Sequence, residues 1–162
     1  MNAAENGWAH EARRLKVARW TEILAAHFLE RGHDTGTILG ARRALIWIDS
    51  ALASDWSRMA REHNDRPPVT SIPFIRAEFQ LRLDAAILAR AFLDLADGIE
   101  VERHRDELAD MLGRFTHAMW AELAVSNGIA PPNDTLKLAA IRRVREGRLE
   151  SAPANDVEES IR

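Results

Sequence analysis

The segment SIPFIRAEFQLRLDAAILARAFLDLADG, Ser71 to Gly98, decides the fold predicted for this chain. Ser71 is a favoured helix N-cap, Pro73 is tolerated in a first helical turn, and Asp97-Gly98 is typical of a tight turn. Between these signals the apolar residues recur at helical spacing and form one stripe, namely Phe74, Leu81, Ala85, Leu88, Phe92 and Leu95. The segment therefore predicts one long amphipathic helix.

Three further long helices are predicted, over residues 9–31, 35–63 and about 99–125. Gly32 ends the first, and Pro67-Pro68 break the chain after the second, because proline cannot continue a helix. Each helix has one apolar stripe and a charged remainder. The stripes are Val17, Trp20, Leu24 and Phe28; Ile38, Leu45, Leu52, Trp56 and Met59; and Val101, Leu108, Met111, Phe115, Ala118 and Val125. If Gly98 lay inside a helix instead, residues 72–127 would form a rod of roughly 80 Å that needs a partner chain.

A shorter helix over residues 135–146 is predicted after the breaker Pro131-Pro132, with Asn133 or Asp134 as its cap. Its narrow apolar edge consists of Leu138, Ile141 and Val144, and the remainder is basic. From Gly147 the chain is polar and acidic, which predicts a disordered tail. The predicted fold is all-α, a four-helix bundle of long antiparallel helices plus a shorter C-terminal helix. Residues 1–128 would form the bundle and residues 129–162 the linker, basic helix and tail.

Composition limits the classes of function. The chain has 162 residues, a net charge of −3 and no cysteine, so disulfides, thiolate metal sites and a cysteine nucleophile are excluded. The N-terminus does not have the pattern of a secretory signal, and no apolar run is long enough to span a bilayer. We expect a cytoplasmic protein without a membrane partner, and without the global basic charge that would favour nucleic acid.

The pair His33-Asp34 lies between the first two predicted helices. It resembles the central pair of the metal-dependent phosphohydrolases of the His-Asp class, whose ligands lie inside a helical bundle. Gly32 stops one helix and Asp34 or Thr35 starts the next, which places the pair at a rim. Aspartate is also a favoured N-cap, because its carboxylate accepts hydrogen bonds from the first-turn amides. We therefore interpret His33-Asp34 as a helix-to-helix joint.

The stretch RMAREH, Arg58 to His63, resembles the short Arg-x4-His signature of HEPN domains, a four-helical family that includes metal-independent RNases. That resemblance implies phosphate stabilisation by Arg58 and proton transfer by His63. Met59 departs from the polar residue that commonly follows the arginine in this family, and the pair ends the second helix instead of starting a late one. A basic helix end, which favours the helix dipole, explains the same residues.

Several polar residues fall within the predicted apolar stripes. These residues are Arg42, Asp49, Glu78, His104 and Glu122. An unpaired buried carboxylate would cost several kcal/mol, so these groups must be paired, bound to a ligand or at the wet margin of the stripe. Di-iron bundles repeat a Glu-x-x-His pair on two helices, and here only Glu30 and His33 have that spacing, interrupted by Gly32. We expect an inter-helix ion-pair layer, with a ligand or metal sensor as the alternative.

Five tryptophans exceed what one small bundle core needs, and Trp47 and Trp120 fall outside the predicted stripes. Large rings outside a core stripe favour a second buried face, typically a contact with another subunit. Arg142 and Arg143 of the last helix are further candidates for contact with a partner. The sequence contains no complete nucleophile–base pair, phosphate loop or metal set, and no cofactor is expected. It favours a non-enzymatic binding or regulatory module that contacts another protein or a second copy of itself; a small hydrolase or RNase is the alternative.

Overall fold

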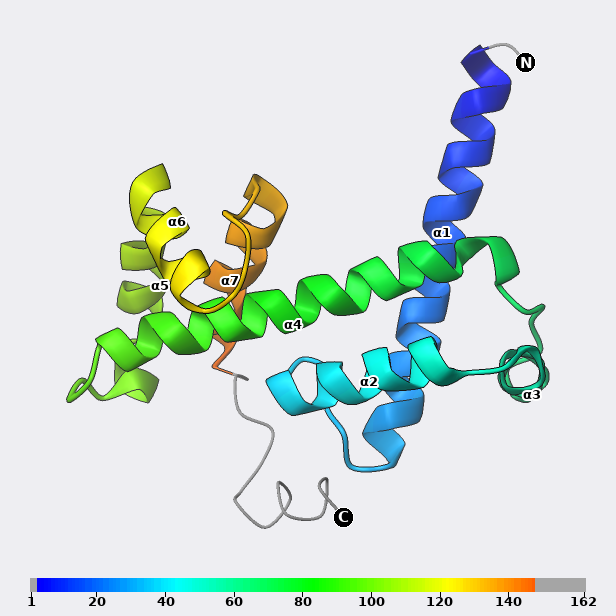
Figure 1. The fold of residues 1–162 in the computed structure, drawn as a ribbon, viewed down its shortest axis with the longest axis horizontal. Coiled ribbons are helices and arrows are strands. Elements are labelled where there is room, and N and C mark those ends of the chain that lie inside the picture. The colour runs from blue at the N-terminus through cyan, green and yellow to red at the C-terminus, as the bar shows by residue number, and fades with distance from the viewer. Residues whose placement is uncertain (1–2, 148–162) are drawn as a thin grey trace.

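The computed structural model describes residues 3–147, and within them the chain is all-helical, which confirms the predicted class (Figure 1). The helices are α1 (Ala3–Glu30), α2 (Ile38–Ser50), α3 (Ala53–Glu62), α4 (Ile72–Leu95), α5 (Arg105–Gly113), α6 (His117–Ser126) and α7 (Asp134–Glu146). Short 3-10 turns, Val69–Ser71 and Val101–Arg103, precede α4 and α5. The acidic tail predicted from the sequence, residues 148–162, lies outside the described residues.

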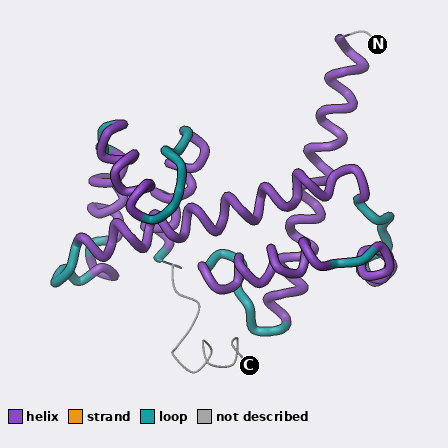
Figure 2. The backbone as a smooth tube through the Cα atoms, viewed as in Figure 1, coloured by secondary structure: helices purple, strands orange, loops and turns teal. Residues whose placement is uncertain are grey.

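Helix α4 is the central helix of the molecule, and two groups of helices pack along it (Figure 2). Helices α1, α2 and α3 gather around its first half, and α5, α6 and α7 around its second half. The segment predicted as one long helix is therefore the element that joins the two cores. Its observed bounds, Ile72–Leu95, agree with the prediction, although Ser71 makes no side-chain capping bond.

The two halves of α4 bury different faces. Ile75, Phe79 and Leu83 enter the first core, whereas Leu88 and Phe92 enter the second. At 100° per residue these two sets point about 160° apart around the helix. Of the single predicted stripe, Ala85, Leu88 and Phe92 are buried, but its first member, Phe74, is 45% exposed and its last, Leu95, is 73% exposed.

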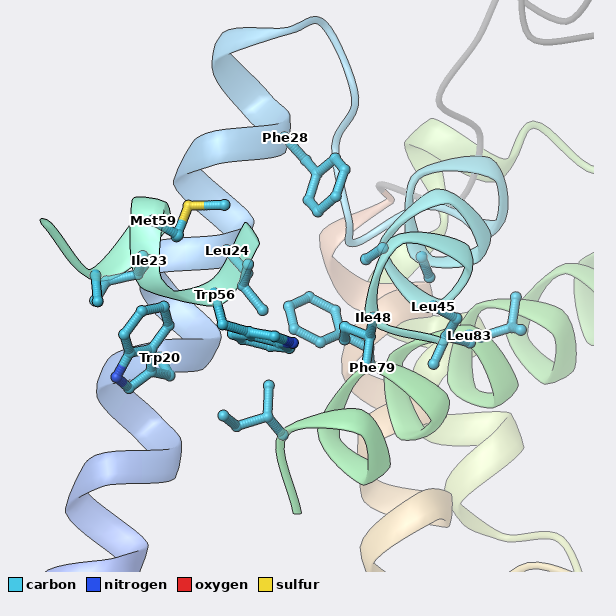
Figure 3. Packing of buried hydrophobic residues seen from close by; sticks show 14 residues of the cluster. Trp20, Ile23, Leu24, Phe28, Leu45, Ile48, Trp56, Met59, Phe79 and Leu83 are labelled. Carbon is cyan, nitrogen blue, oxygen red and sulfur yellow. The ribbon is translucent and has the colours of Figure 1, made fainter. Parts of the chain in front are cut away.

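The first core is rich in aromatic rings (Figure 3). Trp20 of α1 and Trp56 of α3 pack edge to face with ring centroids 5.8 Å apart, and Trp47 of α2 lies 4.9 Å from Trp56. Burying such rings removes a large apolar area from water, and their edge-to-face geometry adds to the stabilisation. Short helices can therefore form a stable core here.

The second core includes α7. Asn133 caps this helix, because its side-chain oxygen accepts a 2.9 Å hydrogen bond from the Leu136 amide. Leu136 and Val144 are buried against α4 and α5, and Leu138, expected at the apolar edge, is 64% exposed. The core therefore extends across the boundary at residue 128 that the sequence indicates.

The prediction of one helix over residues 35–63 is wrong, because the chain breaks between α2 and α3. Ala51 and Leu52 are extended, and the Leu52 amide donates to a side-chain oxygen of Asp55 at 2.8 Å. This contact starts a new helix. Leu52, which was expected in the apolar stripe, lies at this break and is largely exposed. Trp56, on the helix that follows, is buried in the first core.

The prediction of one helix over residues 99–125 is also wrong. Gly98 has a φ of 87° and forms a turn, which rules out the single long rod. The chain breaks again at Thr116, whose side chain accepts from the Met119 amide and caps α6. With both long helices divided, a four-helix bundle arrangement is not confirmed.

Candidate interaction surface

The first half of α1 extends beyond the rest of the molecule (Figure 1). Every described side chain from residue 7 to residue 15 is exposed, whereas Trp20, Leu24 and Phe28 further along the same helix are buried. Trp8 is 80% exposed and Leu15 is 60% exposed. Large apolar side chains on a projecting helix are typical of an interaction surface.

A groove of about 520 Å³ lies where α1 passes α4. The guanidinium of Arg13 lies 4.5 Å from the centre of the Phe74 ring, and His10 Nδ1 is 3.3 Å from an Arg13 nitrogen. Carboxylates from both helices, Glu22 and Glu78, also line the groove. The lining therefore mixes both signs of charge with apolar surface and does not select one charge of ligand.

The predicted polar layer is spread over the molecule. Arg42, Asp49, Glu78 and Glu122 are exposed, on α2, α2, α4 and α6 respectively. His104 precedes α5, and its Nδ1 lies 3.1 Å from a Glu107 oxygen. The structure does not bring these five residues together.

Asp49 has a partner that the sequence did not indicate. Arg76 of α4 donates to both of its carboxylate oxygens, at 2.7 and 3.0 Å. This hydrogen-bonded cation lowers the pKa of Asp49 below its ordinary value. The pair links α2 to α4 at an exposed position, where ion pairs contribute little stability.

Arg58 and His63 lie on different sides of the end of α3. Five helical residues correspond to about 140° of rotation, so their side chains do not converge as a phosphate-cleaving pair would. Arg58 bonds to Asp55 at 3.2 Å, and His63 is the C-cap of the helix. This geometry agrees with the structural explanation of the two residues.

His33 and Asp34 lie in the connection between α1 and α2. One side-chain oxygen of Asp34 accepts from the Gly36 amide at 2.8 Å, and its backbone oxygen accepts from the Thr37 hydroxyl at 2.6 Å. The cap of α2 is Thr37 rather than Asp34, because the Thr37 hydroxyl accepts from the Gly40 amide. The pair is thus part of a joint, with the capping residue three positions later than Asp34.

The residues proposed for a partner contact have different environments. Trp120 is 2% exposed and belongs to the second core, and Trp47 is half-buried against Phe28 and Trp56, so neither ring projects from the surface. Arg142 is exposed. Arg143 is mostly buried, with its guanidinium next to Gly36 in the α1–α2 joint.

The exposed large apolar side chains therefore differ from those predicted to contact a partner. Trp8 and Leu15 are seven residues apart, on the side of α1 opposite its core stripe. That spacing was readable in the sequence. The sequence did not show that Trp47 and Trp120 are covered, because Trp47 packs on Trp56 of α3, after the first break, and Trp120 lies on α6, after the second.

Other kinds of site find little support among the described residues. No group of three or more His, Asp or Glu side chains in residues 3–147 is arranged to hold a metal ion. No helix in that range is both long enough and apolar enough to cross a membrane. Comparison with protein-family models, curated proteins and solved structures found no match to this chain.

Proposed function

We propose that this protein is a non-enzymatic interaction module that acts through protein–protein contacts of α1 and forms a homodimer. The exposure of Trp8 and Leu15, on a helix whose N-terminal end extends past the rest of the molecule (Figure 1), carries this proposal. A monomer gains nothing by exposing a tryptophan on a projecting helix, whereas a partner would bury it. Tryptophan is also among the residues that contribute most at protein interfaces.

The energetics of α1 support a partner. Isolated helices shorter than about 12–15 residues are marginal in water, and residues 7–15 of α1 are all exposed, with Arg13 over the Phe74 ring and His10 and Arg14 at the groove beside α4. Its i,i+3 ion pair between Glu11 and Arg14 is exposed to water, so it adds little stability. A partner protein packed along α1 would stabilise the projecting helical turns and would bury Trp8 at the same time.

Sedimentation velocity tests the proposal directly. The wild-type chain should sediment as a dimer, and a Trp8→Ser/Leu15→Ser variant should sediment as a monomer with an unchanged circular dichroism spectrum. Leu138→Ser is the matched control, because Leu138 is a similarly exposed leucine on α7, and this variant should remain a dimer. A wild-type chain that is monomeric up to high micromolar concentration would contradict the proposal, as would a dimer that survives the double substitution in α1.

The alternatives stay predictions of the sequence. If the protein is an RNase that uses Arg58 and His63, a folded His63→Ala variant should lose RNA cleavage. A ligand sensor that uses the polar layer requires a ligand that raises the melting temperature. Their candidate residues are not gathered in one place, so the surface of α1 has the stronger structural support.

A further inference from the structure

The exposed side of α1 has a regular spacing. Its apolar members are Trp8, Ala12, Leu15, Ala26 and Leu29, with Arg19 and Glu22 at the two intervening positions. Successive members alternate between four and three residues apart, the spacing of a two-helix coiled coil. Every one of these positions is exposed. We call this set the α1 seam.

The α1 seam is separate from the core side of the helix. Trp20, Leu24 and Phe28 face the first core, and Val17 and Ala18 line the groove toward α4, with Glu22 of the seam at the edge of that groove. At 100° per residue the centre of the seam points roughly 170° away from the core side and about 120° away from Val17 and Ala18. A second helix can therefore lie along the seam without displacing the helices that pack on α1.

The two charged positions determine which orientation suits a second copy. In a parallel pair, each Arg19 would face the other Arg19 and each Glu22 the other Glu22, and like charges in an interface are costly. In an antiparallel pair, Arg19 of each copy can face Glu22 of the other. Charge complementarity thus favours two antiparallel copies of α1.

The same requirement selects the register. When Arg19 is opposite Glu22, Leu15 lies opposite Ala26 and Ala12 opposite Leu29 of the other copy. The overlap then runs from Ala12 to Leu29, about 26 Å. Shifting one helix by a heptad would place Arg19 opposite a leucine, which leaves charges without partners in an apolar contact.

Arg19 is held in a position suited to this role. Its Nε donates to Asp65 at 2.6 Å, and a second guanidinium nitrogen lies 3.4 Å from the backbone oxygen of His63. A guanidinium has five N–H donors, so further donors are available for a carboxylate of a second copy. Both Arg19 and Glu22 are exposed in the single chain.

We infer that two copies of this chain pair through the α1 seam as an antiparallel two-helix coiled coil, with reciprocal Arg19–Glu22 contacts at its centre. The inference rests on the proposed function, because it specifies the partner and geometry of the same surface. A polar pair at the centre of an apolar seam fixes register and orientation, at some expense of stability. Trp8 of each copy then covers the end of α1 in the other copy.

Disulfide trapping tests the inference in the full chain, which has no cysteine of its own. Leu15→Cys and Ala26→Cys variants, carrying different tags, are mixed and oxidised. Facing positions are close enough for a disulfide, which requires Cα atoms within about 7 Å. The mixture should give the cross-linked heterodimer, and Leu15→Cys alone should give none. Ala12→Cys mixed with Leu29→Cys should cross-link in the same way.

Charge reversal supplies a second test. Glu22→Arg places Arg19 opposite an arginine and should weaken the dimer by about tenfold or more. Glu122→Arg makes the same change at an exposed position on α6 and should leave the dimer unaltered. Circular dichroism should show both variants to be folded.

The outcomes of these experiments distinguish the antiparallel pairing of α1 from the more general proposal of an interaction module. Efficient cross-linking of Leu15→Cys to itself, or a dimer unaffected by Glu22→Arg, would overturn the antiparallel seam while the interaction module stands. A chain that neither sediments as a dimer nor cross-links at any of these positions would overturn both.

Discussion

The backbone carbonyl of Asp34 fills the place where a β-carbon on Gly40 would project. Gly40 lies in the first turn of α2, and the joint from α1 folds back directly over it. Gly40→Ala should therefore destabilise the protein by about 3 kcal/mol, since backbone rather than a flexible side chain must move. Urea denaturation monitored by circular dichroism measures this change.

Gly113→Ala is the control for that substitution. A β-carbon at Gly113, the last residue of α5, would meet Ile141 at an ordinary 3.7 Å. Alanine loses less conformational freedom on folding than glycine, so this variant should be unchanged or more stable by up to about 1 kcal/mol. If both variants had equal stability, the close contact between Asp34 and Gly40 would be contradicted.

Helix α7 should contribute to stability through one side only. Val144 is fully buried in the second core, and Leu138 on the same helix is exposed. Val144→Ala should lower the free energy of unfolding by about 2 kcal/mol, through lost burial and a residual cavity. Leu138→Ala should change it by less than about 0.5 kcal/mol. A reversed order of the two effects would show that α7 packs through its other side.

The stability of the first core should depend on pH through His27. Partial burial, and secondly the neighbouring Arg31, lower the pKa of His27 below its ordinary value near 6.5. Its Nδ1 lies 3.1 Å from Arg31 Nη1, a contact that suits the neutral ring. The unfolded chain thus binds the proton more readily. The contribution of His27 is fully present above pH 6.5 and is lost as the pH falls from there through the lower folded-state pKa.

Urea denaturation at pH 7.5 and pH 5.5 measures this effect. The loss of stability between the two pH values should be smaller in His27→Gln than in the wild type, even if the variant is less stable at both. An equal loss in the two proteins would assign the pH dependence to other groups.

The class of fold and most helix-stopping signals could be predicted from the sequence. Gly32, Gly98 and Asn133 act locally, through a positive φ or a side-chain cap, and local signals are readable along the chain. The spacing of Trp20, Leu24 and Phe28 also identified the core side of α1 correctly.

The breaks before α3 and α6 could not be predicted in the same way. The Asp55 side chain accepts from the amide of Leu52, the N-cap of α3, and Thr116 caps α6, but each lies within a stretch whose apolar spacing is also compatible with a continuing helix. After the first break the predicted stripe residues Trp56 and Met59 are still buried, whereas after the second break Ala118 and Val125 are exposed and the buried side of α6 differs from the predicted one. Trp120 was consequently placed outside the core that contains it.

The exposed stripe on α1 was missed for a related reason. One stripe was assigned to each helix, and the seam of Trp8 and Leu15 is a second stripe on a helix whose first stripe already explains its burial. Which of two stripes is covered by the same chain depends on tertiary packing. The exposure of the seam is therefore visible only in the folded structure.

Hydrogen–deuterium exchange of the wild-type protein over a range of concentrations tests the central claim most directly. Residues 7–15 have little tertiary packing within one chain, so their backbone amides should be protected only when a second copy covers the α1 seam. The account predicts slow exchange in this segment at high concentration and fast exchange on dilution below the dissociation constant, while Leu88 and Phe92 of α4 remain protected throughout. Fast exchange of residues 7–15 at every concentration would contradict it.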